Sequence, residues 1–112
     1  MRMVEIDDVL IERVVGICYY PHQKPRPGDF FTFERDRFNE KDKFAIAVYD
    51  KDEVQVGHLN RHCAYHFAKL MDAGKVRLLG EYVQDVMYKS PYTQKDTPAY
   101  QIVLWVSSNK IF

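Results

Sequence analysis

The chain has little cysteine, little glycine and no excess of either charge. Its 112 residues include only Cys18 and Cys63, too few for a disulfide framework. The five glycines are scattered, so no glycine-rich phosphate loop is present. Lys and Arg number 16, as do Asp and Glu, so net charge alone argues neither for nucleic acid nor for a membrane surface. No apolar run approaches the ~20 residues of a membrane-spanning helix.

The first eight residues lack a basic segment followed by an apolar run, so no signal peptide is visible. We therefore expect a cytoplasmic protein, without membrane contact and with reduced thiols. A chain of this length can bury one core without staples, so we expect one domain over residues 1–112. Aromatic residues are plentiful, with eight Tyr, seven Phe and one Trp.

Hydrophobic alternation predicts about six short strands, over residues 9–20, 29–34, 44–49, 53–59, 76–87 and 100–107. Residues 21–28 and 88–98 contain prolines and are expected to be loops. Gly57 interrupts the alternation of its strand, which indicates a bulge or a close approach of two backbones. Antiparallel strands of this number predict a mostly β fold, a small closed barrel without exposed edges.

One helix is expected inside this barrel sequence, over about residues 61–73. Asn60 suits the N-cap because its side chain can accept a hydrogen bond from the first free amides. Gly74 suits the left-handed position that ends a helix. The spacing predicts one buried stripe made of Ala64, Phe67, Ala68 and Met71.

Tyr19 and Tyr20 end the first predicted strand, where the chain enters a proline-rich loop. Adjacent strand residues face opposite ways, so one tyrosine should pack inward and the other stay exposed. An exposed ring beside cations suits single-stranded nucleic acid, because a base stacks on the ring while Lys or Arg contacts phosphate. The alternative is that both tyrosines only straddle core and water. The cations that the fold could bring near are Arg35, Arg37, Lys43 and Arg61.

Four possible metal ligands cluster in sequence, namely His58, His62, Cys63 and His66. His62 and His66 would share a helix face, but Cys63 points about 100° away and no HExxH or paired CxxC completes a site. We therefore expect no metal and no cofactor. Cys18 is expected to be a packed, unreactive thiol, and no catalytic residue is assigned. The expected exposed helix face is His62, Tyr65, His66 and Lys69.

Three blocks of the sequence resemble the HIRAN domain family over roughly residues 9–80. These blocks are Val14-Val15-Gly16 with Tyr19-Tyr20; Arg35-Asp36 with Asn39, Asp42, Ala45-Ile46 and Val48; and Gln55-Val56-Gly57-His58-Leu59 with Ala64 and Leu70-Met71-Asp72. Such domains occur in DNA-remodelling helicases and as small free-standing bacterial proteins. The resemblance implies a barrel of modified oligonucleotide-binding type, which agrees with the strand count. It also implies binding to the 3′ end of single-stranded DNA.

The resemblance further implies roles for single residues. Tyr19 matches a tyrosine that stacks on the terminal base, and Tyr20 matches its neighbour along the DNA backbone. Asp42 matches the acidic residue that accepts a hydrogen bond from the 3′ hydroxyl, and it would repel a 3′ phosphate. Two further family positions are held by Asn39 and His58.

The resemblance implies a phosphate contact for Arg61, which stands where the family has a lysine near the helix start. We expect Arg35 or Lys43 to contact phosphate together with it. Some positions depart from the family pattern. Cys18 replaces an arginine that clamps phosphate, and Lys41 replaces an aromatic that completes a base sandwich. Phe38, three residues before Lys41, could substitute for that aromatic if its loop turned it inward. Phe44 stands where the family has an asparagine.

These observations together predict a non-catalytic module that binds nucleic acid, specifically single-stranded DNA or its 3′-hydroxyl end. The family context links it to DNA repair or replication-fork processing, with a helicase or nuclease as partner. A protein-interaction barrel is the alternative, since strand edges and exposed aromatics also suit peptide binding. A zinc-dependent hydrolase is the least favoured class. The oligomeric state stays open.

Overall fold

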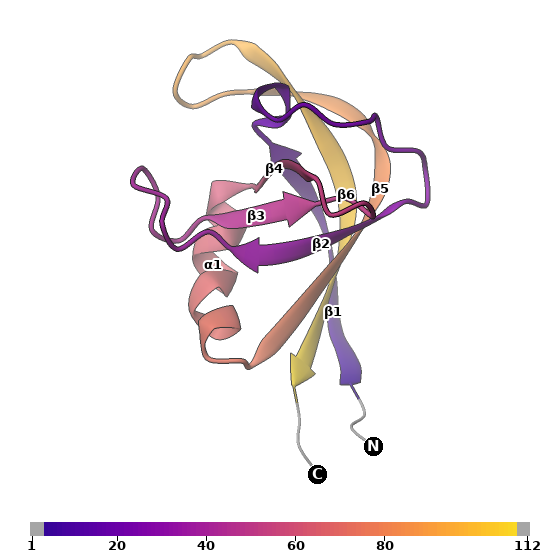
Figure 1. The fold of residues 1–112 in the computed structure, drawn as a ribbon, viewed down its shortest axis with the longest axis vertical. Helices are drawn as coiled ribbons and strands as arrows, with labels where there is room; N and C mark the ends of the chain where they lie inside the picture. Colours follow the sequence, from indigo (N-terminus) through magenta and orange to yellow (C-terminus); the bar gives the residue numbers. More distant parts are fainter. Residues whose placement is uncertain (1–3, 110–112) are drawn as a thin grey trace.

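The computed structural model describes residues 4–109, which form a closed antiparallel barrel with one α-helix (Figure 1). Its strands follow the order β1-β4-β3-β2-β5-β6, and β6 pairs with β1. The predicted mostly β barrel with six strands and one internal helix is therefore confirmed. The predicted domain of residues 1–112 also includes residues 1–3 and 110–112, which lie outside the described part. The elements are β1 (Val4–Val15), a short 3₁₀ helix η1 (Ile17–Tyr19), β2 (Phe30–Arg35), β3 (Ile46–Tyr49), β4 (Gln55–Leu59), α1 (Arg61–Asp72), β5 (Val76–Lys89) and β6 (Asp96–Asn109).

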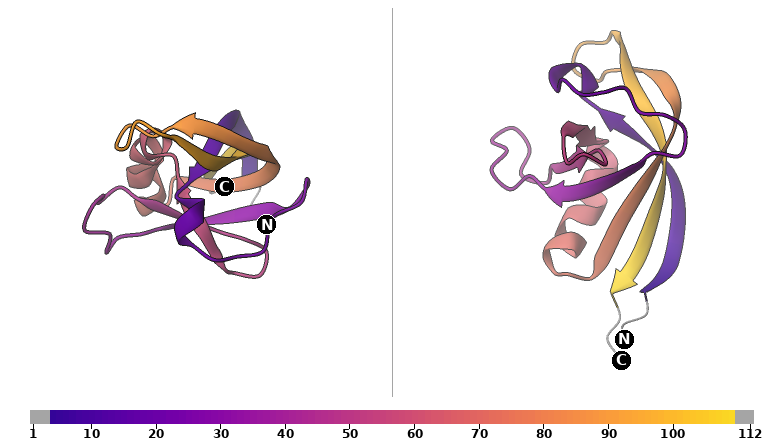
Figure 2. Two further views of the ribbon diagram at one scale, coloured as in Figure 1. Left: turned by 90° about the horizontal axis from the view of Figure 1, so that it is seen from above. Right: turned by 45° about the vertical axis from the view of Figure 1, so that its right-hand side comes forward.

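The long strands β1, β5 and β6 form the tall side of the barrel, and the short strands β2, β3 and β4 cross them (Figures 1 and 2). β5 and β6 pair over their full length, from Val76–Ser108 to Lys89–Asp96. The prediction of a loop over residues 88–98 was wrong in its bounds. β5 and β6 stay paired as far as Lys89 and Asp96, so the connection between them is only residues 90–95. Pro98 is tolerated inside β6 because β6 stops pairing with β1 at Tyr100 and is an edge strand beyond it.

β1 ends earlier than predicted, at Val15 rather than at residue 20. Gly16 has a φ of 72°, a left-handed conformation that turns the chain out of the strand and into η1. Cys18, predicted to be packed inside a strand, is exposed on η1 as a result. Gly57 fulfils its prediction of a close approach, since an added Cβ would lie 2.4 Å from the carbonyl oxygen of Val15.

α1 contributes its apolar face to the same core as the strands. Its N-cap is Asn60, whose side chain accepts a hydrogen bond from the His62 amide at 3.2 Å, as predicted. Gly74 has a φ of 68° just after the helix, also as predicted. The buried helix residues are Cys63, Ala64, Phe67 and Ala68, with Met71 half-buried. The largest buried side chains around them are Phe31, Ile46, Leu59, Ile102 and Leu104.

Candidate nucleic-acid interface

The tyrosine pair lies on and just after η1, beside the end of β1. Tyr19 is 80% exposed, whereas Tyr20 is half-buried, so the expected division into an outer and an inner ring holds although neither residue is in a strand. The Tyr20 hydroxyl lies 3.4 Å from Nδ1 of His58. Burial and the nearby Asp36 carboxylate raise the pKa of Tyr20, so this hydroxyl stays protonated near neutral pH.

His58 connects Tyr20 to an acidic residue that the sequence reading left without a role. Its Nε2 lies 2.8 Å from a carboxylate oxygen of Asp36, and the Asn39 side chain donates to the same oxygen at 3.3 Å. The chain Tyr20–His58–Asp36 joins η1, β4 and the segment after β2. These contacts hold the imidazole ring in one orientation. Asp36 was part of a block that resembles the family, but no spacing rule pairs it with a histidine 22 residues away.

Residues 36–45 form a loop that its own polar side chains shape. The Asn39 side-chain oxygen accepts hydrogen bonds from the amides of Lys41 and Asp42, both at 3.0 Å. One carboxylate oxygen of Asp42 then accepts from the Phe44 amide at 2.9 Å. The other oxygen lies 3.6 Å from Nε of Arg61, at the start of α1. Asp42 is therefore fixed in place while one of its oxygens faces Arg61.

Arg61 also contacts an aromatic residue that the sequence reading missed. Its guanidinium donates to the hydroxyl of Tyr92 and lies 5.8 Å from the centre of that ring. Tyr92 sits in the turn between β5 and β6 and is 71% exposed. Tyr92 lies outside the three blocks of family resemblance and 31 positions from Arg61, so no local pattern pairs the two.

These residues enclose a cleft of about 440 Å³, which we call the Asp42 cleft. Four of the predicted site residues line it, together with the cation Lys41 and the ring of Tyr92. An anionic ligand with an aromatic group would find both a cation and a ring at its wall. The lining residues are Val15, Asn39, Lys41, Asp42, Ala45, His58, Leu59, Arg61 and Tyr92.

Arg35, predicted to contact phosphate, is committed to the protein instead. Its side chain is only 10% exposed. It donates to the backbone carbonyls of Lys43, at 2.8 Å, and Ala45, and it pairs with Asp72 at 3.0 Å. A guanidinium with these partners fastens the loop of residues 36–45 to β2 and to the end of α1.

Lys43 and Phe38 also lie outside the lining of the Asp42 cleft. The Lys43 ammonium lies 5.2 Å from the centre of the Phe44 ring, which in turn packs edge-on against Tyr65 of α1. Phe38 is 95% exposed, so the loop does not turn it inward to replace the missing aromatic. Lys41, at that family position, does line the cleft.

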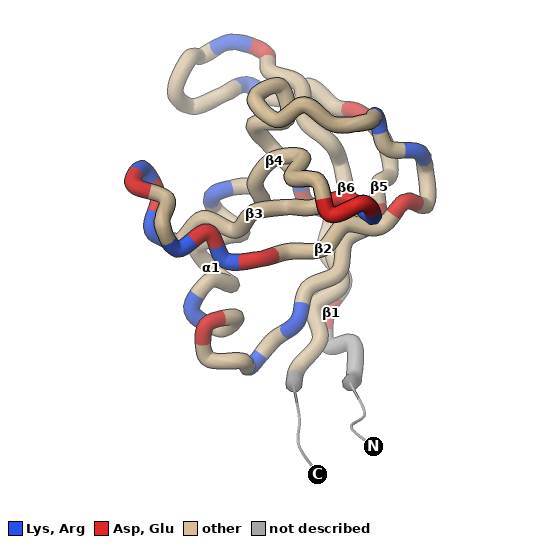
Figure 3. The backbone as a smooth tube through the Cα atoms, in the orientation of Figure 1, with Lys and Arg blue, Asp and Glu red and all other residues tan. Residues whose placement is uncertain are grey.

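Charge near the cleft is mixed rather than of one sign. Figure 3 shows Lys and Arg alternating with Asp and Glu along the loop of residues 36–45, and further basic positions beside the β5–β6 turn. This distribution agrees with the zero formal net charge of the chain. Any attraction of a polyanion must therefore come from a few cations close to the cleft.

The helical histidines belong to the exposed face of α1, as expected. His62 and His66 are exposed, whereas Cys63 is buried. Burial and the neighbouring Glu12 raise the pKa of Cys63 to about 12. Within residues 4–109 there is no group of three or more His, Cys, Asp or Glu side chains that could hold a metal ion. In the same part of the chain, neither helix has the length and apolar character needed to cross a membrane.

The closed barrel and its cleft define the class of protein, a small β-barrel binding domain. Comparison of the sequence with models of known families identifies the family. The model of the HIRAN domain matches residues 9–98, so the chain belongs to the HIRAN family, as the sequence predicted. A comparison with curated proteins gives no match.

Solved structures share this fold. The crystal structure of the HIRAN domain of human HLTF is 24% identical, with a TM-score of 0.68 over 91% of this chain and 79% of that one. The NMR structure of the HLTF HIRAN domain in its DNA-bound conformation is 23% identical, with a TM-score of 0.69 over 96% and 80%. A crystal structure of a protein from Lactobacillus plantarum is 23% identical, with a TM-score of 0.68 over 97% and 100%.

Proposed function

We propose that this chain is a non-catalytic module that binds single-stranded DNA at its 3′-hydroxyl end in the Asp42 cleft. The observation that carries the proposal is the Asp42 carboxylate, which uses one oxygen to cap the Phe44 amide and presents the other beside Arg61. A carboxylate accepts a hydrogen bond from a sugar hydroxyl but repels a phosphate in the same place. Membership of the HIRAN family supports DNA as the ligand, because the HLTF domain has a DNA-bound conformation.

In this proposal two exposed rings stack on the terminal base. Tyr19 projects from η1 and Tyr92 from the β5–β6 turn. Both rings are open to a ligand, since Tyr19 is 80% and Tyr92 is 71% exposed. In this proposal Tyr92 supplies the second stacking surface that Lys41 cannot. Base–aromatic stacking contributes about 1–3 kcal/mol per base.

Phosphate contacts fall to the cations that line the cleft, Arg61 and Lys41. Arg61 also belongs to the first turn of α1, where free amides favour an anion. Arg35 and Lys43 do not line the cleft and are assigned no contact with DNA. Tyr20 would lie along the DNA backbone, and its link to His58 and Asp36 fixes the direction of its hydroxyl.

The experiment is fluorescence anisotropy with a short strand labelled at its 5′ end, carrying either a 3′ hydroxyl or a 3′ phosphate. Hydrogen bonds to charged groups contribute about 1.5–3 kcal/mol, so we expect the hydroxyl strand to bind at least tenfold more tightly. Asp42→Asn keeps an acceptor for the Phe44 amide but loses the charge, and it should reduce the preference. Asp52→Asn, an exposed turn residue outside the cleft, is the control. Equal binding of both strands by the native protein would remove end recognition.

A protein-interaction barrel is a second candidate, because one outer face of the barrel is apolar. Val9 and Ile11 of β1 and Leu79 of β5 are exposed, at 53%, 61% and 42%. Such patches often mark contact surfaces. Salt separates the two functions, since affinity for single strands should fall with a log–log slope of about −0.7 per phosphate contacted. Affinity for an apolar protein partner would barely change. The repair context, a helicase or nuclease partner and the cytoplasmic location stay predictions from the sequence.

A further inference from the structure

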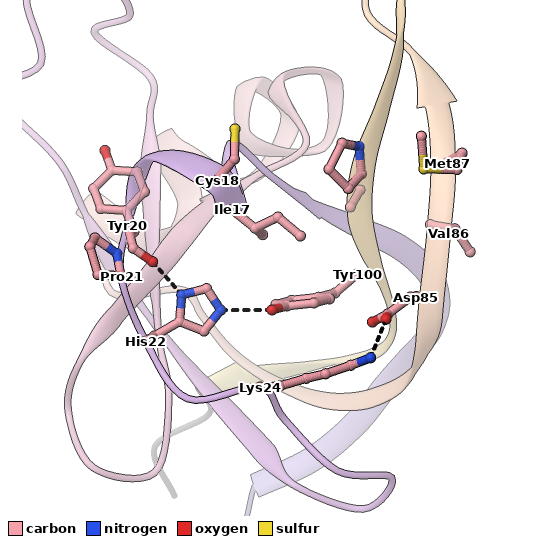
Figure 4. A pocket seen from close by; sticks show the side chains of 12 residues that line it. Ile17, Cys18, Tyr20, Pro21, His22, Lys24, Asp85, Val86, Met87 and Tyr100 are labelled. Carbon is pink, nitrogen blue, oxygen red and sulfur yellow. Dashed lines mark hydrogen bonds and ion pairs between the residues drawn. The ribbon is translucent and has the colours of Figure 1, made fainter.

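A second hollow, of about 560 Å³, lies between residues 17–24 and the facing parts of β5 and β6 (Figure 4). We call it the Tyr100 pocket. It shares no lining residue with the Asp42 cleft. Its wall is mainly apolar, from Ile17 and Pro21 on one side and Val86, Met87 and Ala99 on the other. An apolar hollow of this size with a few polar groups at its wall is a candidate ligand site.

The pocket is held in shape by a network of rings. Tyr100 is only 6% exposed, and its ring stacks on Phe31 with an angle of 6° between the ring planes. Its hydroxyl lies 2.7 Å from Nε2 of His22, whose Nδ1 contacts the backbone carbonyl of Tyr20. Figure 4 shows these contacts from Tyr20 through His22 to Tyr100 along one side of the pocket. A ligand would therefore meet a preformed surface.

One ion pair bridges the two sides of the hollow. The ammonium of Lys24 lies 2.7 Å from a carboxylate oxygen of Asp85, and both side chains reach solvent. The Tyr82 hydroxyl donates to the other oxygen of Asp85 at 2.7 Å. A ligand would therefore use the remaining N–H groups of Lys24 and the remaining lone pairs of the Asp85 carboxylate, beside an apolar surface. A nucleobase has this combination, an apolar face and an edge of donors and acceptors. A phosphate fits less well, because Asp85 would repel it.

We propose that the Tyr100 pocket receives a nucleobase of the same strand, upstream of the nucleotide held in the Asp42 cleft. The inference rests on the proposed function and adds a second base site to it. The walls of the two hollows touch, because Tyr20 lines one and His58 lines the other, with 3.4 Å between hydroxyl and Nδ1. The exposed Tyr19 on η1 lies next to Cys18, which also lines the pocket. A strand that passes Tyr19 therefore has a route to the pocket.

Strand length tests this second site. The probe is a series of 5′-labelled oligothymidylates of increasing length, each with a 3′ hydroxyl. We expect affinity to rise by about tenfold at the length that lets a base reach the pocket. Met87→Glu places a charge at the pocket wall at a side chain that is already 62% exposed. This variant should abolish the rise while the shortest strand that binds keeps its affinity within about twofold. Val83→Glu adds the same charge to β5 outside the pocket and should behave like the native protein.

Cys18 gives a second measurement on the native chain, because it is exposed and lines the pocket while Cys63 is buried. Alkylation of Cys18 by a maleimide should become slower once the strand is long enough for a base to reach the pocket. Affinity that does not depend on strand length would overturn the second site and leave end binding intact. The same holds if Met87→Glu and Val83→Glu lose affinity equally for strands of every length. No binding at any length would refute the proposed function and this inference together.

Discussion

Replacing Gly57 with alanine tests how closely the fold and the candidate site depend on each other. The new Cβ would lie 2.4 Å from the Val15 carbonyl oxygen and 3.2 Å from a methyl group of Val14. Ordinary contact begins at 3.4 Å, so one of the two backbones must move by about 1 Å. Overpacking of this kind costs about 1–3 kcal/mol, and the melting temperature should fall by about 5–20 °C for a domain near this size.

Thermal unfolding followed by circular dichroism measures this loss, with Gly80→Ala as the matched control. A Cβ at Gly80 would meet the far end of the Phe33 ring at 2.9 Å, and a side chain can rotate away where a backbone cannot. We therefore expect a smaller loss of stability from Gly80→Ala. Since Val15 leads directly into η1, Gly57→Ala should also weaken DNA binding below the melting temperature, whereas Gly80→Ala should not. A Gly57→Ala protein with native melting temperature and native affinity would refute the reasoning.

Two further predictions concern a ring and the two thiols. Tyr92→Ala should weaken binding of a 3′-hydroxyl strand by about 1–3 kcal/mol in an anisotropy titration, while Tyr92→Phe keeps most of the affinity because the ring stays. Tyr65→Ala removes a similarly exposed ring from α1 and is the control, so equal losses from Tyr65→Ala and Tyr92→Ala would contradict a stacking role. Burial raises the pKa of Cys63 to about 12, so its thiol stays protonated at pH 8. A disulfide reagent should then modify Cys18 alone until denaturant is added, and two fast-reacting thiols in the folded protein would show that Cys63 is accessible.

Local sequence patterns predicted which helix and strands form, but they predicted the ends of the strands less well. The stripe from Ala64 to Met71 between Asn60 and Gly74 predicts α1 almost to the residue, because capping and helical periodicity are local properties. The strands were found but not their lengths. Whether a segment such as residues 88–89 or 96–98 is a strand depends on a partner across the sheet, and Pro98 marks a loop only when that partner is ignored.

The candidate site shows the same division. The family resemblance indicates Asn39, Asp42, His58 and Arg61, and the structure brings these four residues to one cleft. Charge and sequence order also suggested Arg35, yet its guanidinium is used by two backbone carbonyls and by Asp72. A sequence shows that a cation is present, but its availability depends on which acceptors the fold places around it.

The sequence by itself determined a small antiparallel barrel of the HIRAN family, with a capped helix after the fourth strand and a tyrosine pair beside the first. These features follow from residue types a few positions apart and from short blocks in a fixed order. Only the tertiary structure decided that Tyr92 joins Arg61 and that Asp36 holds His58. It alone placed a second pocket beside the first cleft. Contacts between residues 22 to 31 positions apart depend on strand register and loop path, and a one-dimensional pattern does not carry that information.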